Sequence, residues 1–169
     1  MKHCCDDLHI GDHVLSVRPI AITDVDRLAR LFTRLSPESV HFRFFSPIAK
    51  PPRAALLRLA DVDHDRRDAL VAMLGDEIVA VARYDGRPGT ETAEIALTVE
   101  DAWQHHGVGR LLATQLAKRA RSHGYHEFVA TMLPDNRAAL GLVRKLSPDA
   151  KVNWAGGEYE ASMPLFRAS

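Results

Sequence analysis

The chain has 169 residues, enough for one domain that buries most of its apolar side chains in a single core. Lysine and arginine together number 22, as do aspartate and glutamate, so no global charge attracts nucleic acid or an anionic membrane. No run approaches the roughly 20 consecutive apolar residues of a membrane span, and the first residues hold acids and histidines where a signal peptide has an apolar stretch.

The chain's two cysteines, Cys4 and Cys5, are adjacent in a polar segment, residues 1–12, that we predict to be a mobile tail. Adjacent cysteines in a tail cannot form disulfide bonds that cross-link the fold, which favours a reducing, cytoplasmic setting. These adjacent cysteines and the scattered histidines around them lack the paired spacing of structural zinc sites, so we predict no metal site. The sequence thus predicts a soluble cytoplasmic protein whose single domain spans residues 13–169.

The first third of that domain predicts one strand followed by three helices. Residues 13–18 alternate apolar and polar side chains as a strand does, and residues 22–35 then place apolar side chains at helical spacing. Two further helices are predicted within residues 36–47 and 51–63, where prolines mark the boundaries and the second helix stops near Asp61.

The middle of the chain predicts an antiparallel meander. Three β-rich runs occupy residues 68–74, 77–85 and 93–101. The first two are separated by Gly75 and Asp76, and the last two by Gly-Arg-Pro-Gly-Thr-Glu, which are turn sequences suited to hairpins.

The last third predicts helices alternating with strands. From Gly107 the apolar side chains fall on one face of an amphipathic helix that ends at Gly124, and a strand (127–133), a helix capped by Asn136 and a last strand (157–165) follow. The predicted order is β-ααα-βββ-α-β-α-β, which describes an α/β fold with a mixed, mostly antiparallel sheet flanked by helices.

Two glycines stand at a strand-to-helix junction within residues 104–112, Gln-His-His-Gly-Val-Gly-Arg-Leu-Leu. The first amides of a helix lack partners and attract anions, and Gly107 and Gly109 remove side chains where a phosphate would sit. The same glycines could instead serve only a tight turn. Two nucleotide motifs are excluded, because no Gly-Lys-Ser/Thr is present and the third glycine of the dinucleotide fingerprint would fall on Leu112.

Residues 97–112 resemble the acyl-CoA pyrophosphate loop of the GNAT superfamily of N-acyltransferases, and residues 135–146 resemble its later asparagine-containing helix. The order of elements resembles that fold from about His13 to Pro164. Residues 35–47, 61–72 and 93–101 further resemble the catalytic domain of bacterial Pat-type protein lysine acetyltransferases. Those enzymes commonly carry a regulatory domain, which this sequence does not imply, so their usual target, an acyl-CoA synthetase, does not transfer automatically.

The resemblance implies an acetyl-CoA site built mainly from backbone. The amides of Val108, Gly109 and Arg110 would hold the pyrophosphate, and Leu97, Thr98 and Val99 would offer strand groups to the pantetheine arm. The loop would be shaped by Gln104, His105, His106 and Gly107, with Asn136 beside the cofactor. The alternatives are core packing for the strand residues, a solvated helix position for Arg110 and a simple helix cap for Asn136.

Glu94 is the candidate general base, because it matches the catalytic glutamate of the Pat-type enzymes. Only a neutral amine attacks a thioester, and ordinary pKa values of about 10.4 for lysine and 4.3 for glutamate leave a gap of roughly 8 kcal/mol. We expect burial beside an apolar acyl pocket, or a water relay, to close much of it. Without the resemblance, Glu94 would be interpreted as a charged residue on the solvent-exposed face of a strand. Val143 occupies the place of the tyrosine that protonates the leaving thiolate in many relatives, so no side-chain acid is expected.

The resemblance therefore implies an acetyl-CoA-dependent N-acetyltransferase that modifies a lysine on a protein. A small-amine acetyltransferase and a non-catalytic acyl-CoA-binding sensor are the alternatives. Arg43, Phe44 and Phe45 could border the acceptor groove, although the two aromatic rings fit a core equally well. No nucleic-acid or membrane partner is expected, and the oligomeric state stays open.

Overall fold

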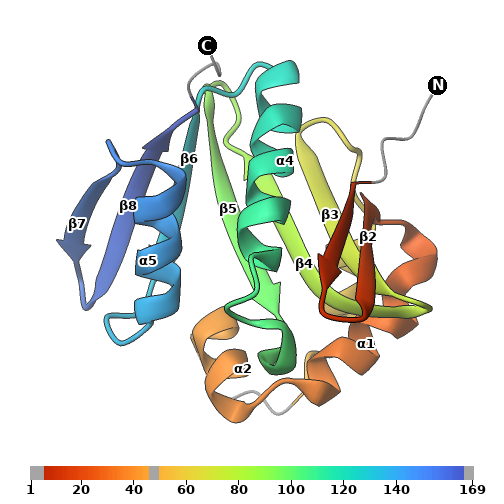
Figure 1. Ribbon diagram of the computed structural model, residues 1–169. Helices are drawn as coiled ribbons and strands as arrows, with labels where there is room; N and C mark the ends of the chain where they lie inside the picture. The colour runs from red at the N-terminus through yellow and green to blue at the C-terminus, as the bar shows by residue number, and fades with distance from the viewer. Residues whose placement is uncertain (1–5, 46–49, 166–169) are drawn as a thin grey trace.

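The computed structural model describes residues 6–45 and 50–165, which form one eight-stranded sheet with helices on both faces (Figure 1). The strands lie in the order β1-β2-β3-β4-β5-β6-β8-β7. Their bounds are Asp7–Ile10 (β1), His13–Pro19 (β2), Arg67–Leu74 (β3), Glu77–Gly86 (β4), Thr92–Val99 (β5), Glu127–Met132 (β6), Lys151–Ala155 (β7) and Glu158–Pro164 (β8). Neighbouring strands are antiparallel except β5 and β6, which are parallel.

The described residues also contain five α-helices and two short 3₁₀ turns. The helices are α1 (Val25–Arg34), α2 (Pro37–Phe44), α3 (Arg53–Ala60), α4 (Val108–Ser122) and α5 (Arg137–Leu146), and the turns are η1 (Ile22–Asp24) and η2 (Asp101–Trp103). Proline starts α2 at its first position, where the missing N–H costs nothing, and Asn136 caps α5 as predicted.

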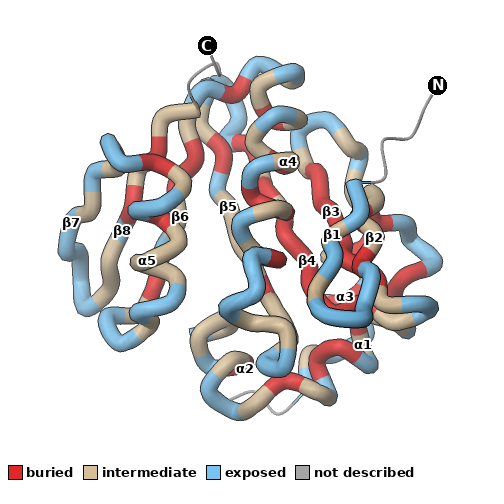
Figure 2. The backbone as a smooth tube through the Cα atoms, viewed as in Figure 1, coloured by how far each residue is buried: buried red, intermediate tan, exposed pale blue. Residues whose placement is uncertain are grey.

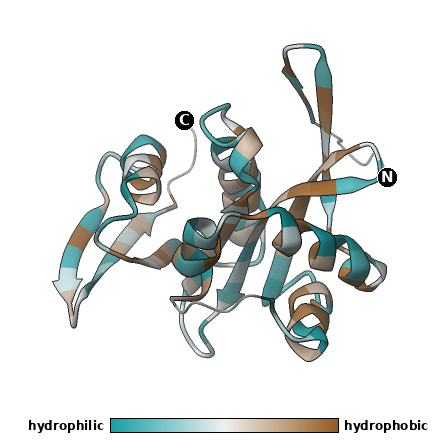
Figure 3. Cartoon of the chain, turned by 90° about the horizontal axis from the view of Figure 1, so that it is seen from below, coloured by the Kyte–Doolittle hydropathy of each residue, from teal (hydrophilic) through white to brown (hydrophobic). Residues whose placement is uncertain are grey.

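Two apolar clusters hold the helices to opposite faces of the sheet, and the buried residues of the central strands and α4 stand out in Figure 2. Leu112 and Leu116 of α4 share one cluster with Ala82 of β4, whereas Leu28 of α1 shares the other with Val81. Side chains alternate along a strand, so adjacent β4 residues face different helices. Seen from below, α5 and the β7–β8 hairpin form a lobe beside the main body (Figure 3).

The predicted fold class and element order are confirmed, with two strands added. β1 lies in the segment predicted to be a tail and pairs with β2, while β7 pairs with β8 across Gly156 and Gly157. Both glycines have positive φ, which suits a two-residue hairpin turn. β7 was missed because it is mostly exposed and lacks apolar alternation. Cys4 and Cys5 lie outside the described residues.

Candidate active site

The centre of the candidate site is the place where β5 and β6 separate. β4 pairs with β5 along its length, from Ala93 to Val99. β6 pairs with β5 only at Thr92, Ala93 and Glu94, and the two strands then diverge (Figure 1). The rest of β5 therefore has one paired edge and one edge that β6 leaves open.

Backbone groups of Leu97 and Val99 point toward that open edge. The Glu100 amide donates to the Val79 carbonyl at 2.9 Å, which makes Ala80 and Val99 a non-hydrogen-bonded antiparallel pair. Residues of such a pair direct their N–H and C=O groups away from each other, and the direction repeats every second residue. Thr98, in contrast, directs its backbone groups to β4, and its buried hydroxyl has no hydrogen-bond partner.

The start of α4 supplies free amide donors close to this edge. Gly107 precedes the helix with φ of 84° and offers no side-chain cap. The first backbone bond of the helix runs from the Leu111 amide to the Gly107 carbonyl at 3.0 Å. The amides of Val108, Gly109 and Arg110 therefore have no acceptor within the helix, as the anion-site hypothesis requires.

The two glycines of the loop have different surroundings. A Cβ atom at Gly107 would meet nothing within 4 Å, so this glycine is required by its left-handed backbone and leaves open space. A Cβ atom at Gly109 would lie 2.9 Å from the Leu97 side chain. The missing side chain of Gly109 therefore lets α4 pack closely on β5, and phosphate binding at its amide stays a prediction.

Gln104 ties the loop to two other elements. Its side-chain nitrogen donates to the Val99 carbonyl at 3.0 Å and to the Ser39 hydroxyl at 3.2 Å. Asp101 accepts hydrogen bonds from the amide and hydroxyl of Ser36 and from the hydroxyl of Ser39. Burial opposes the charge of Asp101, but these bonds outweigh it and lower its pKa. The loop is thus fixed to the start of α2, a connection that the sequence did not reveal.

The other predicted cofactor residues occupy the rim of this region. His105, with positive φ, and His106 are exposed, as is Arg110. The Asn136 side-chain oxygen accepts from the Ala139 amide at 3.1 Å, so Asn136 caps α5 whatever else it contacts. Val143 is buried in the core at 5% exposure and provides no proton donor.

Glu94 lies on β5 with its side chain 61% exposed and its carboxylate 2.9 Å from Arg87. It faces away from Ala93, Ile95 and Leu97, as the strand pattern predicted. The burial that we expected around this carboxylate is absent among the described residues, so that expectation is wrong for the free chain. The helices that pack on this face cover the strand further along, near Ala96, rather than at Glu94.

The aromatic residues of α2 divide between core and surface. Phe44 packs on Phe32 with ring centroids 5.3 Å apart, which supports a core role. Phe45 ends the helix in a left-handed conformation and is exposed. Arg43 instead lines a small pocket with Arg83, a residue that the sequence analysis did not select. A lone arginine inside the apolar run of residues 77–85 was the signal that could have found it.

Within residues 6–45 and 50–165, no cluster of three or more histidine, cysteine or acidic side chains is arranged to bind a metal ion. Across the same described residues, no helix combines the length and apolarity needed to cross a membrane.

Comparison with known proteins identifies the chain as an acetyltransferase and gives its family. Residues 30–147 match the acetyltransferase (GNAT) family, so the chain belongs to that family. An acetyltransferase of Pseudomonas aeruginosa is 32% identical over 157 residues, covering 87% of this chain and 84% of its own length. Enzymes of this family use acetyl-CoA, and structures of this fold include complexes with acetyl-CoA or coenzyme A.

Two further similarities point to the Pat-type group. Acetyltransferase Pat of Mycolicibacterium smegmatis is 34% identical over 134 residues, which cover 77% of this chain and 40% of that protein. The GNAT domain of the S. lividans Pat protein superposes with a TM-score of 0.88 at 28% identity, covering 96% of this chain and 97% of that domain. The chain thus spans less than half of the Mycolicibacterium protein.

Proposed function

We propose that the chain transfers the acetyl group of acetyl-CoA directly to an amine, and that this amine is a lysine side chain on a protein. The observation that carries the proposal is the open edge of β5, whose backbone groups lead from Leu97 and Val99 to the free amides of α4. The amides of a pantetheine arm pair with such an edge as an added strand would. A pyrophosphate fits the start of a helix.

The reaction forms a C–N bond and breaks the C–S bond of the thioester. The neutral amine attacks the carbonyl carbon, which backbone amides near Leu97 and Val99 would polarise, and the coenzyme A thiolate leaves. Glu94 would take the proton that the nitrogen loses, directly or through one water. A thiol has an ordinary pKa near 8.5, so the thiolate leaves without a side-chain acid, in agreement with a valine at position 143.

The exposure of Glu94 makes it reachable by a large acceptor. A protein laid over this face would cover the carboxylate and replace its contact with Arg87. A bound acceptor would thus exclude water from the carboxylate while the amine is in place. The similarity to the two Pat proteins supports a lysine acceptor, although the acceptor of this chain is a proposal of ours.

The test is release of free coenzyme A from acetyl-CoA, measured for wild type and Glu94→Gln against acyl-CoA synthetase proteins and a panel of small amines. We expect release with a protein acceptor, a loss of about 100-fold or more in Glu94→Gln at neutral pH, and retained acetyl-CoA binding. The variant should recover partly as pH rises, because the acceptor then deprotonates unaided.

Glu91→Gln is the matched control, since Glu91 is an exposed acid at the start of the same segment. It should keep wild-type rates. Full activity of Glu94→Gln would remove Glu94 from the mechanism. Release only with small amines would replace the protein acceptor by a small one, and tight binding without release for any acceptor would favour an acyl-CoA sensor.

A further inference from the structure

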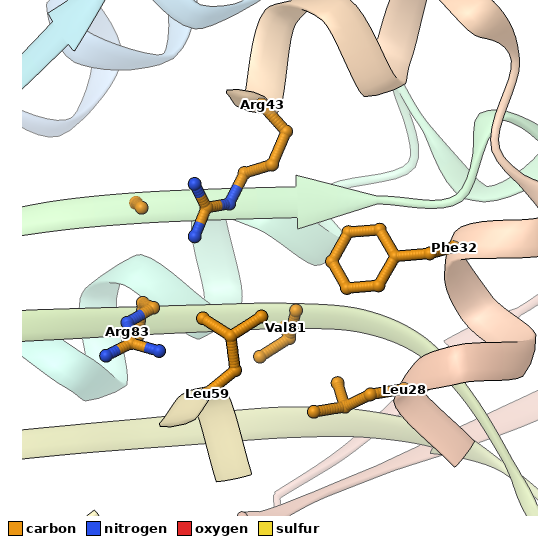
Figure 4. Close-up of a pocket in the computed structure, with 7 residues that line it drawn as sticks. Leu28, Phe32, Arg43, Leu59, Val81 and Arg83 are labelled. Carbon is orange, nitrogen blue, oxygen red and sulfur yellow. The ribbon is translucent and has the colours of Figure 1, made fainter. Parts of the chain in front are cut away.

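A small hollow lies on the face of the sheet covered by α1, α2 and α3 (Figure 4). Its empty volume, which includes some open solvent, is about 260 Å³, and the room within it for the centre of a water-sized molecule is about 10 Å³, close to what one water molecule needs. Two arginines, Arg43 and Arg83, line it. Its other lining side chains are apolar: Leu28, Phe32, Leu59, Val81 and Ala96.

Arg83 enters this hollow from β4, opposite Ala96 of β5. Its Nη1 atom is buried and has no hydrogen-bond partner. Burial, together with the nearby charges of Arg43 and Arg67, lowers the pKa of Arg83 to about 10. The guanidinium therefore sits where its charge is poorly solvated.

Arg43 reaches the same hollow from α2, and its guanidinium lies over the Phe44 ring at 5.1 Å from the ring centroid. Burial lowers the pKa of Arg43 as well. Two guanidinium groups from different elements thus converge on one apolar-walled space, and the charge of Arg43 contributes to the lowered pKa of Arg83.

No carboxylate of the described residues bonds to either arginine. The acids nearest in register are engaged elsewhere, since Asp85 lies 3.5 Å from Arg67 and Glu94 lies 2.9 Å from Arg87. Residues 46–49, which are not described, have the sequence Ser-Pro-Ile-Ala and so carry no acidic side chain. Proteins bury charges with partners because an unpaired buried charge costs several kcal/mol. The missing partner is therefore expected to come with a ligand.

We propose that Arg43 and Arg83 form a subsite for a carboxylate carried by one of the two substrates. Guanidinium groups bind planar carboxylates through paired hydrogen bonds, and the enclosed space suits carboxylate oxygens rather than a whole molecule. Its place in catalysis rests on the proposed function: Ala96 is two residues after Glu94 on the same face of β5, about 7 Å along the strand. The carboxylate belongs either to the acceptor, next to the reacting amine, or to the acyl group of the donor.

Binding is tested without turnover, by thermal unfolding in succinate or in uncharged succinamide at constant ionic strength. Saturating succinate should raise the Tm of the wild type by about 2–4 °C and succinamide should not. Arg83→Met and Arg43→Met should lose this shift, whereas Arg58→Met, an exposed arginine of the neighbouring α3, should keep it. Without ligand, Arg83→Met should be at least as stable as the wild type, because it removes a buried unpaired charge.

An equal effect of succinate and succinamide on the wild type would overturn the subsite. So would a succinate shift that survives in both methionine variants, or an Arg83→Met protein that is markedly less stable without ligand, since that would make the arginine structural.

The source of the carboxylate is tested by turnover. Lysine peptides with glutamate or glutamine beside the lysine, and amino acids with their carboxamides, are compared as acceptors, while acetyl-CoA and succinyl-CoA are compared as donors. A preference of about 10-fold or more in kcat/KM that disappears in Arg83→Met assigns the carboxylate to that substrate. Turnover with no preference for a carboxylate, either among the acceptors or between the two donors, would overturn the proposal. No turnover with any acceptor would refute the proposed function instead, and the succinate shift would still decide the subsite.

Discussion

At the scale of single residues, Gly107 and Gly109 of the loop before α4 have different roles: one concerns backbone conformation and the other concerns packing. A side chain at Gly109 would come within 2.9 Å of the end of the Leu97 side chain, which would have to shift, whereas Gly107 is needed for its backbone conformation and faces open space. Only Gly107 can therefore be altered to probe anion binding without disturbing the packing of α4 on β5.

Replacing Gly107 by aspartate should weaken coenzyme A binding by about 10-fold or more, because a carboxylate would compete with phosphate for the amides of Val108 to Arg110. Gly107→Asn is the matched control, since asparagine has the same shape without the charge and both residues tolerate positive φ. Titration calorimetry at low salt measures both affinities. If the aspartate and asparagine variants bind equally well, the pyrophosphate does not lie at this helix start.

At the scale of elements, Asp24 fixes α1 to β2 and thereby places one wall of the Arg43–Arg83 hollow. Its side chain is 1% exposed and accepts two hydrogen bonds from Arg18, at 2.7 and 2.8 Å, and one from the Ala21 amide at 2.8 Å. Burial opposes its charge, but the hydrogen bonds and the charges of Arg18 and Arg27 outweigh burial and lower the pKa of Asp24.

Asp24→Asn should destabilise the protein by about 3 kcal/mol at neutral pH, because it leaves Arg18 without its partner. A lowered folded-state pKa adds stability that is complete above the ordinary carboxyl value near pH 4 and is lost as pH falls through the lowered value. The deficit of the variant should therefore shrink in acid. Urea unfolding at pH 7 and near pH 3 measures this, and a deficit that does not change with pH would show that Asp24 stabilises α1 without its charge.

At the scale of the whole molecule, the elements with strong periodicity were predictable and the contacts between distant segments were not. The apolar spacing of α4 and the meander of β3 to β5 follow from local patterns. The bonds of Ser36 to Asp101 join residues 65 positions apart, and the approach of Arg43 to Arg83 joins α2 to β4. The exposure of Glu94 was mispredicted for the same reason, because it depends on where α2 and α3 lie on the sheet.

The partial pairing of β5 and β6 also predicts how substrate changes the molecule. β6 joins β5 through only three residue pairs, so the remaining residues of β5 have no described strand on that side. The amide hydrogens along this open edge should therefore exchange readily in the free protein. Amides of Leu97 and Val99 point to that edge, whereas those of Ala96 and Thr98 bond to β4 with or without ligand.

Coenzyme A should therefore slow amide exchange at Leu97 and Val99 by about 10-fold or more, and change Ala96 and Thr98 much less, when exchange is followed by NMR. The alternation within one strand is the internal control, because general stabilisation would slow all four amides together. Equal slowing at the four positions, or none at Leu97 and Val99, would mean that the pantetheine arm does not pair with β5. Alternating protection would show that the substrate itself completes the sheet where β6 departs, and so couples the α5 lobe to the body that carries Glu94.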